Sequence, residues 1–159
     1  PIRAGEPVLM DMAFGFRGYL SDHTRIYAID GLADDLLEAH NAMLEIQELV
    51  KKTARPGMTA GSVYDLAAER VAELGYADNF MGAGEGRVRF VGHGVGIELD
   101  EYPVLAAGQK MVLEEGMVVA VEPKAVFPER GVVGIENTHV VTKTGLEQLG
   151  RYTEAVIIV

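Results

Sequence analysis

The sequence predicts a single domain of mixed helix and strand content, in which strand pairs near both ends of the chain flank two central helices. Three observations predict this class. Apolar residues recur at helical spacing in two central segments, short apolar runs bounded by turn residues occur near both ends, and one strand-pair pattern occurs twice. With 159 residues, 48% of them hydrophobic, the chain is long enough to enclose one substantial core.

Composition and charge narrow the classes of function. The net charge of −10 argues against a nucleic-acid partner, because neutralising phosphates requires clustered lysine and arginine. No apolar run approaches membrane-spanning length, so we expect no membrane partner and a cytoplasmic location. The chain has no cysteine, so any bound metal has to be held by histidine, aspartate or glutamate.

The first block of the chain, residues 5–27, is expected to form two strands. The apolar run Val8–Phe14 predicts the first strand, and Gly18 with the residues after it predicts the second. A turn near Gly15 would join them.

Two helices are expected next. Apolar residues at helical spacing predict a helix over residues 33–54, which the segment Arg55–Gly57 ends. Thr59 is a suitable N-cap for a second helix, and Gly75 is a suitable stop.

The remaining chain is expected to be rich in strands. The glycine-rich residues 81–86 lack a lysine and a following helix N-terminus, so we interpret them as a flexible loop rather than a phosphate site. They lead into a strand that ends at His93. Apolar runs at residues 118–122, 134–141 and 155–159 predict further strands.

An internal repeat relates the first and last blocks. In both Gly5–Asp11 and Gly116–Glu122, an acidic residue lies six residues after a glycine, at the end of an apolar run. A second acid follows across a turn, Asp22 in the first copy and Glu136 in the second. One strand-pair unit that offers two acids therefore occurs twice.

The two copies differ in what precedes them. Two helices and the His93 strand precede the second copy, but only four residues precede the first. In a duplicated architecture, similar helices and strands precede both copies, so we expect the chain to be the C-terminal piece of a longer one. The first helices and strands of the first repeat would then be absent.

Five residues combine into a candidate metal site: Asp11, Asp22, His93, Glu122 and Glu136. The repeat would bring the two acid pairs together across a pseudo-symmetric sheet, where four carboxylates would repel one another strongly. Two divalent cations about 3.5–4 Å apart would neutralise them and orient a bridging water or hydroxide. One imidazole among carboxylates suits Mn, Co, Fe or Zn rather than Ca or Mg. The glycines on both sides of His93 would leave room for metal and substrate.

Structural roles are the alternative for each of these residues. An aspartate at a strand end is commonly a cap or turn residue, and a lone histidine is commonly a structural one. Glu122 and Glu136 would also fit solvated strand positions. However, Glu122 follows an apolar run and precedes Pro123, so an unpartnered charge there would be costly.

The same residues resemble the signatures of a known family. The segment Asp11–Arg25, DMAFGFRGYLSDHTR, is similar to the "D-x-G…G-Y-x-S-D-x-T-R" motif of the metallopeptidase family M24, which contains prolidase, aminopeptidase P, creatinase and methionine aminopeptidase. Gly92–Gly96, Val121–Pro123 and Gly134–Thr138 resemble the family's three later motifs, in the family's order. The resemblance covers nearly the whole chain and is closest to the Xaa-Pro peptidase-like branch.

The resemblance implies an α+β pita-bread (creatinase/aminopeptidase) fold, a curved antiparallel sheet with helices on its outer face, here incomplete at the N-terminus. Residues 1–159 would be a single, truncated catalytic-type domain with a dinuclear metal centre. Mn is favoured for the two divalent ions over Co, Zn or Fe. The full-length protein is expected to form a homodimer.

Residue roles follow by position in the family's motifs. Asp11 would chelate one ion, and His93 and Glu122 would bind the other. Asp22 and Glu136 would bridge the two ions. Glu122 would also move the proton of the attacking water, so Glu122 and His93 are the predicted catalytic residues.

Two departures from the family pattern affect the expected activity. The family's second histidine, seven residues after the His93 position, is Asp100 here, and we predict that Asp100 contacts the substrate. The family's first catalytic histidine would lie before Pro1. We therefore expect this chain alone to be weakly active or inactive on dipeptides, and metal binding to weaken where the site is incomplete.

Three functions fit these residues. The favoured one is a metal-dependent hydrolase resembling Xaa-Pro dipeptidase or aminopeptidase, which cleaves a small peptide with a metal-activated water. The second is a creatinase-like hydrolase or lyase that acts on another small molecule, which Asp100 favours. The third is a catalytically silent pita-bread binding module, against which the five intact ligands argue.

Overall fold

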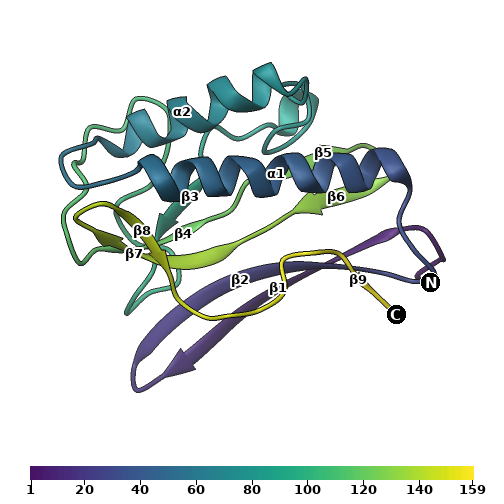
Figure 1. Cartoon of the computed structure of the whole chain (residues 1–159), viewed down its shortest axis with the longest axis horizontal. Helices are drawn as coiled ribbons and strands as arrows, with labels where there is room; N and C mark the ends of the chain where they lie inside the picture. The colour runs from purple at the N-terminus through teal and green to yellow at the C-terminus, as the bar shows by residue number, and fades with distance from the viewer.

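The computed structural model describes the whole chain, residues 1–159, as a curved layer of strands with two helices along one side (Figure 1). The helices are α1 (Asp34–Thr53) and α2 (Ala60–Glu73). They pack against each other and over the strands of the second half of the chain. This α+β arrangement is the fold class that the sequence predicts.

Both helices begin and end where the sequence predicts. Two aspartates in the first turn of α1 and two lysines in its last turn match the signs of the helix dipole. The Thr59 side chain accepts a hydrogen bond of 3.1 Å from the backbone N–H of Ser62, which satisfies one free N–H group at the start of α2. Gly75 follows α2 with a φ of +83°, a conformation that ends a helix.

A long hairpin forms from β1 (Pro7–Phe16) and β2 (Tyr19–Ala28). Its turn lies at Arg17 and Gly18, so the predicted turn near Gly15 is wrong. Both turn residues have positive φ, +52° and +86°, as in a two-residue turn whose twist matches that of the flanking strands. Gly15 therefore stays within the strand ladder.

The second half of the chain forms most of the other strands. A four-stranded antiparallel sheet has the order β3-β4-β7-β8, and β5 and β6 form a separate hairpin. The bounds are β3 (Gly92–Gly94), β4 (Val118–Val121), β5 (Lys124–Phe127), β6 (Gly131–Gly134), β7 (Asn137–Thr142) and β8 (Gly145–Gln148). The glycine-rich residues 81–86 lie in the predicted loop, which contains only a short 3-10 helix, η1 (Gly84–Gly86).

Two of the predicted strands differ from the observed ones. The predicted strand 134–141 is divided, because β6 ends at Gly134 and Glu136 lies before the start of β7. Gly134, where β6 ends, has a φ of +149°, and a Cβ there would lie 2.4 Å from the Pro123 carbonyl oxygen, so this position requires glycine. The predicted strand 155–159 is reduced to β9 (Ile157–Ile158), which pairs with β2 in the only parallel pairing of the sheets.

The two halves of the chain meet where β2 runs beside β7. The backbone N–H of Thr24 donates to the Glu136 carbonyl at 3.2 Å, and the two residues form an antiparallel bridge. Next to this bridge, the Thr138 hydroxyl accepts from the Asp22 N–H at 2.8 Å and donates to the Asp22 carbonyl at 3.0 Å. The two strand pairs of the repeat, β1–β2 and β4–β7, therefore join through their second strands.

The hydrophobic core lies between the helices and the sheet. Buried side chains of α1 and α2 such as Met43, Ile46 and Val63 form one cluster with Val119, Val141 and other apolar residues of the strands. No helix of the protein is both long enough and apolar enough to span a bilayer.

His139 gives the core a titratable group. It lies in β7, is fully buried, and has no hydrogen-bond partner at either ring nitrogen. Burial lowers its pKa from 6.5 to about 4. Because the pKa is lower in the folded state, the unfolded state takes up the proton first, and stability is lost as the pH falls from 6.5 through about 4.

We expect this titration to remove up to about 3 kcal/mol from the free energy of unfolding between these pH values. Urea denaturation at a series of pH values measures the loss. The variant His139→Leu should show a smaller loss over the same range, since it lacks the titrating group. An equally steep loss in His139→Leu would contradict this account.

Candidate metal centre

The strand register places the predicted residues on one side of the joined sheet. His93 pairs with Ala120, and Ala120 pairs with Thr138. Thr138 contacts Asp22 across the junction, and Asp22 pairs with Ala13. Since directly opposed residues of antiparallel strands point to the same side, His93 and Asp22 face the same space.

A second row of paired residues carries the other acids. Asp11 pairs with Thr24, and Thr24 pairs with Glu136. Thr24 is two residues from Asp22, so this row lies on the same side as the first. The Thr24 hydroxyl also donates to Glu136 Oε2 at 2.7 Å, which fixes the direction of that carboxylate.

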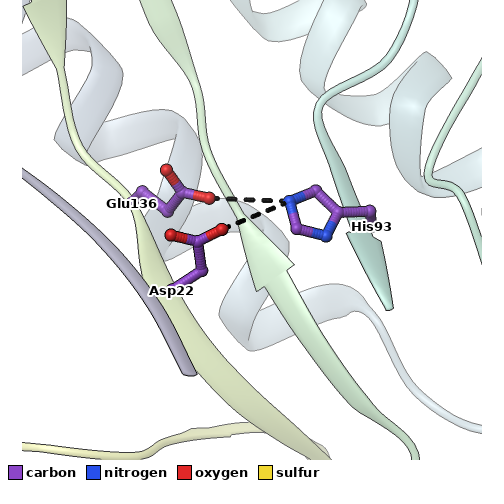
Figure 2. Close-up of side chains that lie close together, drawn as sticks. All are labelled: Asp22, His93 and Glu136. Atoms are coloured by element: carbon purple, nitrogen blue, oxygen red, sulfur yellow. Dashed lines mark ion pairs between the residues drawn. The ribbon is translucent and has the colours of Figure 1, made fainter. Parts of the chain in front are cut away.

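His93 lies at the centre of the cluster. Its Nε2 is 3.6 Å from Glu122 Oε1, 3.7 Å from Glu136 Oε1 and 3.9 Å from Asp22 Oδ2. Figure 2 shows the carboxylates of Asp22 and Glu136 directed at this ring nitrogen. Nδ1 is 3.0 Å from the Gly94 carbonyl oxygen, so a proton on Nδ1 can be donated there. That tautomer leaves Nε2 free as a ligand, as metal-binding histidines require.

The donor set of this cluster fits a divalent ion. The ligand atoms of Asp22, His93 and Glu136 lie within 4.8 Å of one another, and all three residues are buried. An imidazole nitrogen combined with carboxylate oxygens suits Mn, Fe, Co or Zn. Glu122 adds a further carboxylate on the same side of the imidazole.

Lys124 belongs to the same cluster, although it is not part of any of the sequence motifs that predict the site. Its Nζ donates to Glu122 Oε2 at 2.8 Å and to Glu136 Oε2 at 3.0 Å, and it lies 3.7 Å from Asp11 Oδ2. Lys124 and Glu122 are two residues apart on an extended chain, which places their side chains on the same side. This spacing is the sequence signal that would have found Lys124.

Asp11 and Asp100 lie at the edge of the cluster. Their side chains are 52% and 78% exposed, and Asp100 Oδ1 is 3.5 Å from His93 Nδ1. The structure brings all six predicted residues around one cavity, which is lined by Asp11, Ala13, Asp22, His93, Leu99, Asp100, Glu122 and Glu136.

The glycines beside His93 do not have the role that we predicted. A Cβ on Gly92 would lie 2.1 Å from the Ala120 carbonyl oxygen, and one on Gly94 would lie 2.4 Å from the Tyr102 carbonyl oxygen. Strand alternation directs both positions away from the side of the sheet that His93 faces. These glycines therefore allow close approach of neighbouring backbone, rather than space for metal and substrate.

Charge interactions stabilise a protonated His93 beside an ionised Glu136. Burial alone would lower the pKa of His93, but the nearby Glu136 carboxylate, the Gly94 carbonyl and the charge of Glu122 raise it to about 9. Burial alone would raise the pKa of Glu136, but His93 and Lys124 lower it to about 2. In the metal-free protein at neutral pH, His93 therefore carries a proton that a metal ion would displace.

The pKa values of the other buried acids shift upward, in the opposite direction to that of Glu136. Burial and the negative charge of Glu136 raise the pKa of Asp22 to about 6, and the same two causes raise the pKa of Glu122 above its ordinary value. Burial alone would lower the pKa of Lys124, but Glu136 and Glu122 raise it above its ordinary value. The cluster therefore has more carboxylate charge than His93 and Lys124 neutralise, and a further cation would relieve this excess.

Comparison with known proteins relates this site to a family. The family described as Peptidase_M24, Metallopeptidase family M24, matches residues 1–143. The Xaa-Pro dipeptidase of Pyrococcus furiosus is 34% identical over 148 residues, which are 93% of this chain and 40% of that protein. The chain thus spans about two fifths of the length of this relative.

Solved structures of similar proteins show the same fold. The Xaa-Pro dipeptidase from Bacillus anthracis is 34% identical, has a TM-score of 0.89, and is matched over 99% of this chain and 42% of that one. The X-Pro aminopeptidase from Thermotoga maritima MSB8 is 29% identical with a TM-score of 0.89, over 99% of this chain and 42% of that one. These likenesses confirm the α+β pita-bread fold that the sequence motifs implied.

Proposed function

The chain belongs to metallopeptidase family M24, and on that premise we propose that it acts in metal-dependent hydrolysis of small peptides, as an Xaa-Pro dipeptidase or aminopeptidase. The observation that carries this proposal is the convergence of three buried residues with metal-ligating side chains, Asp22, His93 and Glu136, beside the carboxylate of Glu122. Relatives named Xaa-Pro dipeptidase support the substrate class.

Each residue has a specific part in this proposal. Asp22, His93 and Glu136 would hold a divalent ion, which when bound lowers the pKa of water and polarises a carbonyl oxygen. Glu122 would accept the proton of the attacking water and pass it to the leaving amine. Its raised pKa suits this exchange, because a carboxyl that titrates closer to neutral pH can both take up and release the proton.

The finer details of the cofactor and partners are part of the proposal. Mn is the first candidate for the metal, followed by Co, Zn and Fe, because the site combines one imidazole with carboxylates. The homodimer and the cytoplasmic location expected from the sequence stay predictions.

The two other functions considered for the sequence are less favoured. A creatinase-like hydrolase or lyase would use the same fold, but the relatives that are about a third identical to this chain include proteins named Xaa-Pro dipeptidase. A silent binding module would not need a buried cluster of acids around an imidazole, which is costly without a cation. We therefore retain peptide hydrolysis as the proposal.

The protein in its full natural length, supplied with Mn, should release free proline from Ala-Pro. Removal of metal with a chelator should abolish this activity, and renewed addition of Mn should restore it. The variant Asp22→Asn should lower the rate by about 100-fold or more, because it removes a proposed direct ligand. Mutation of residues that only hydrogen-bond to metal ligands already lowers metal affinity or activity by about 10- to 100-fold. Chromatography of released proline measures each rate.

A matched control is Asp65→Asn, which removes an exposed carboxylate on α2 and should leave the rate unchanged. Undiminished hydrolysis after chelation, or by Asp22→Asn, would contradict the proposal.

Asp100 is the residue of the cavity that we propose to set substrate preference. Its side chain is largely exposed and lies beside His93, where it adds negative charge to the entrance of the cavity. An ionised acid there favours a cationic group or a water network over the carbonyl of an ordinary dipeptide, because it has no proton to donate.

The variant Asp100→His should therefore increase kcat/KM for ordinary dipeptides relative to cationic substrates, with metal content unchanged. Asp100→Asn serves as the control that removes the charge without adding an imidazole. An unchanged substrate profile in both variants would identify Asp100 as a turn residue without a role in substrate choice.

A further inference from the structure

We propose that the ammonium group of Lys124 takes the place of one of the two cations of this site, so that the protein binds one divalent ion per chain instead of two. This inference deepens the proposed function and rests on it. It concerns the side of the acid cluster that lies away from His93.

The two glutamates divide the cluster into two cation positions. Oε1 of Glu122 and Oε1 of Glu136 lie 3.6 Å and 3.7 Å from His93 Nε2. Oε2 of the same two residues lies 2.8 Å and 3.0 Å from Lys124 Nζ. Each carboxylate therefore bridges an imidazole on one side and an ammonium on the other.

A separate aspartate completes each position. Asp22 Oδ2 lies 3.9 Å from His93 Nε2, and Asp11 Oδ2 lies 3.7 Å from Lys124 Nζ. The first position, beside His93, therefore combines an imidazole with three carboxylates, and its only positive charge is a proton on the ring. The second position, between Asp11, Glu122 and Glu136, already contains a positive charge supplied by the chain.

Lys124 is held in this place by its surroundings. Its side chain is 14% exposed, and its amino group donates hydrogen bonds to both glutamates. The backbone around it is fixed as well, since its carbonyl accepts from Met81 N–H at 2.9 Å and it pairs with Gly134 in the β5–β6 hairpin. If the ammonium moved away, two buried carboxylates would lie close together with no positive charge between them.

A second divalent ion would compete with this ammonium for the same oxygens. The ion would need Oε2 of Glu122 and Oε2 of Glu136, the two atoms that Lys124 contacts, and it would lie beside a like charge. One divalent ion and Lys124 together supply three positive charges to the four carboxylates Asp11, Asp22, Glu122 and Glu136. Two divalent ions and Lys124 would exceed the charge of these acids.

Metal stoichiometry tests the inference directly. After equilibrium dialysis against Mn, elemental analysis of the purified protein should give one Mn per chain. The variant Lys124→Ala removes both the charge and the bulk of the side chain and should bind two. Lys124→Arg keeps the charge and should bind one, and Lys110→Ala, which removes an exposed lysine elsewhere, should also bind one.

The electron paramagnetic resonance spectrum of bound Mn gives a second readout that is independent of the elemental analysis. The wild-type protein should show isolated Mn ions, and Lys124→Ala should show a spin-coupled pair.

Two Mn per chain in the wild-type protein would overturn the inference, and so would one Mn per chain in a folded Lys124→Ala. Either result would leave the proposed function standing. A wild-type protein that binds no Mn would overturn the inference. A wild-type protein that also fails to release proline would overturn the proposed function.

Discussion

The antiparallel contact between β2 and β7 is the constraint on which the site depends. Each strand pair of the repeat carries its own acids, and neither pair alone surrounds a cation. The bridge between Thr24 and Glu136, together with the Thr138 contacts to Asp22, aligns the two pairs so that their acids fall into two neighbouring rows. A shift of this register by one residue would place the acids of one strand pair on the opposite side of the sheet from the acids of the other pair.

The contact between β2 and β7 also has an electrostatic consequence. Bringing acids from both halves together in a buried place requires positive charge, and the protein supplies part of it from His93 and Lys124. Glu136, which contacts both, has a strongly lowered pKa, whereas Asp22 has a raised one. The acids are therefore not equivalent, although the repeat presents them as equivalent pairs. The remaining excess of negative charge lies beside the imidazole, where a divalent ion fits.

Much of this arrangement follows from local sequence patterns. Helical spacing, a threonine cap and a glycine stop predict both helices, and the glycine-to-acid repeat relates the two strand pairs. The patterns could not reveal what depends on contacts between distant segments. The glycines beside His93 are explained by backbone at Ala120 and Tyr102, and the glycine at the end of β6 is explained by the carbonyl of Pro123. Lys124 was missed because a basic residue is not a metal ligand, although its position two residues after Glu122 places it in the acid cluster.

The positions of cations in a crystal of the Mn-loaded protein would show whether Lys124 occupies the second cation position. Anomalous diffraction at the manganese edge locates each ion without reference to activity. We expect one anomalous peak between Asp22, His93 and Glu136, with the Lys124 ammonium still between Glu122 and Glu136. A second peak between Asp11, Glu122 and Glu136, with Lys124 turned away from both glutamates, would contradict it.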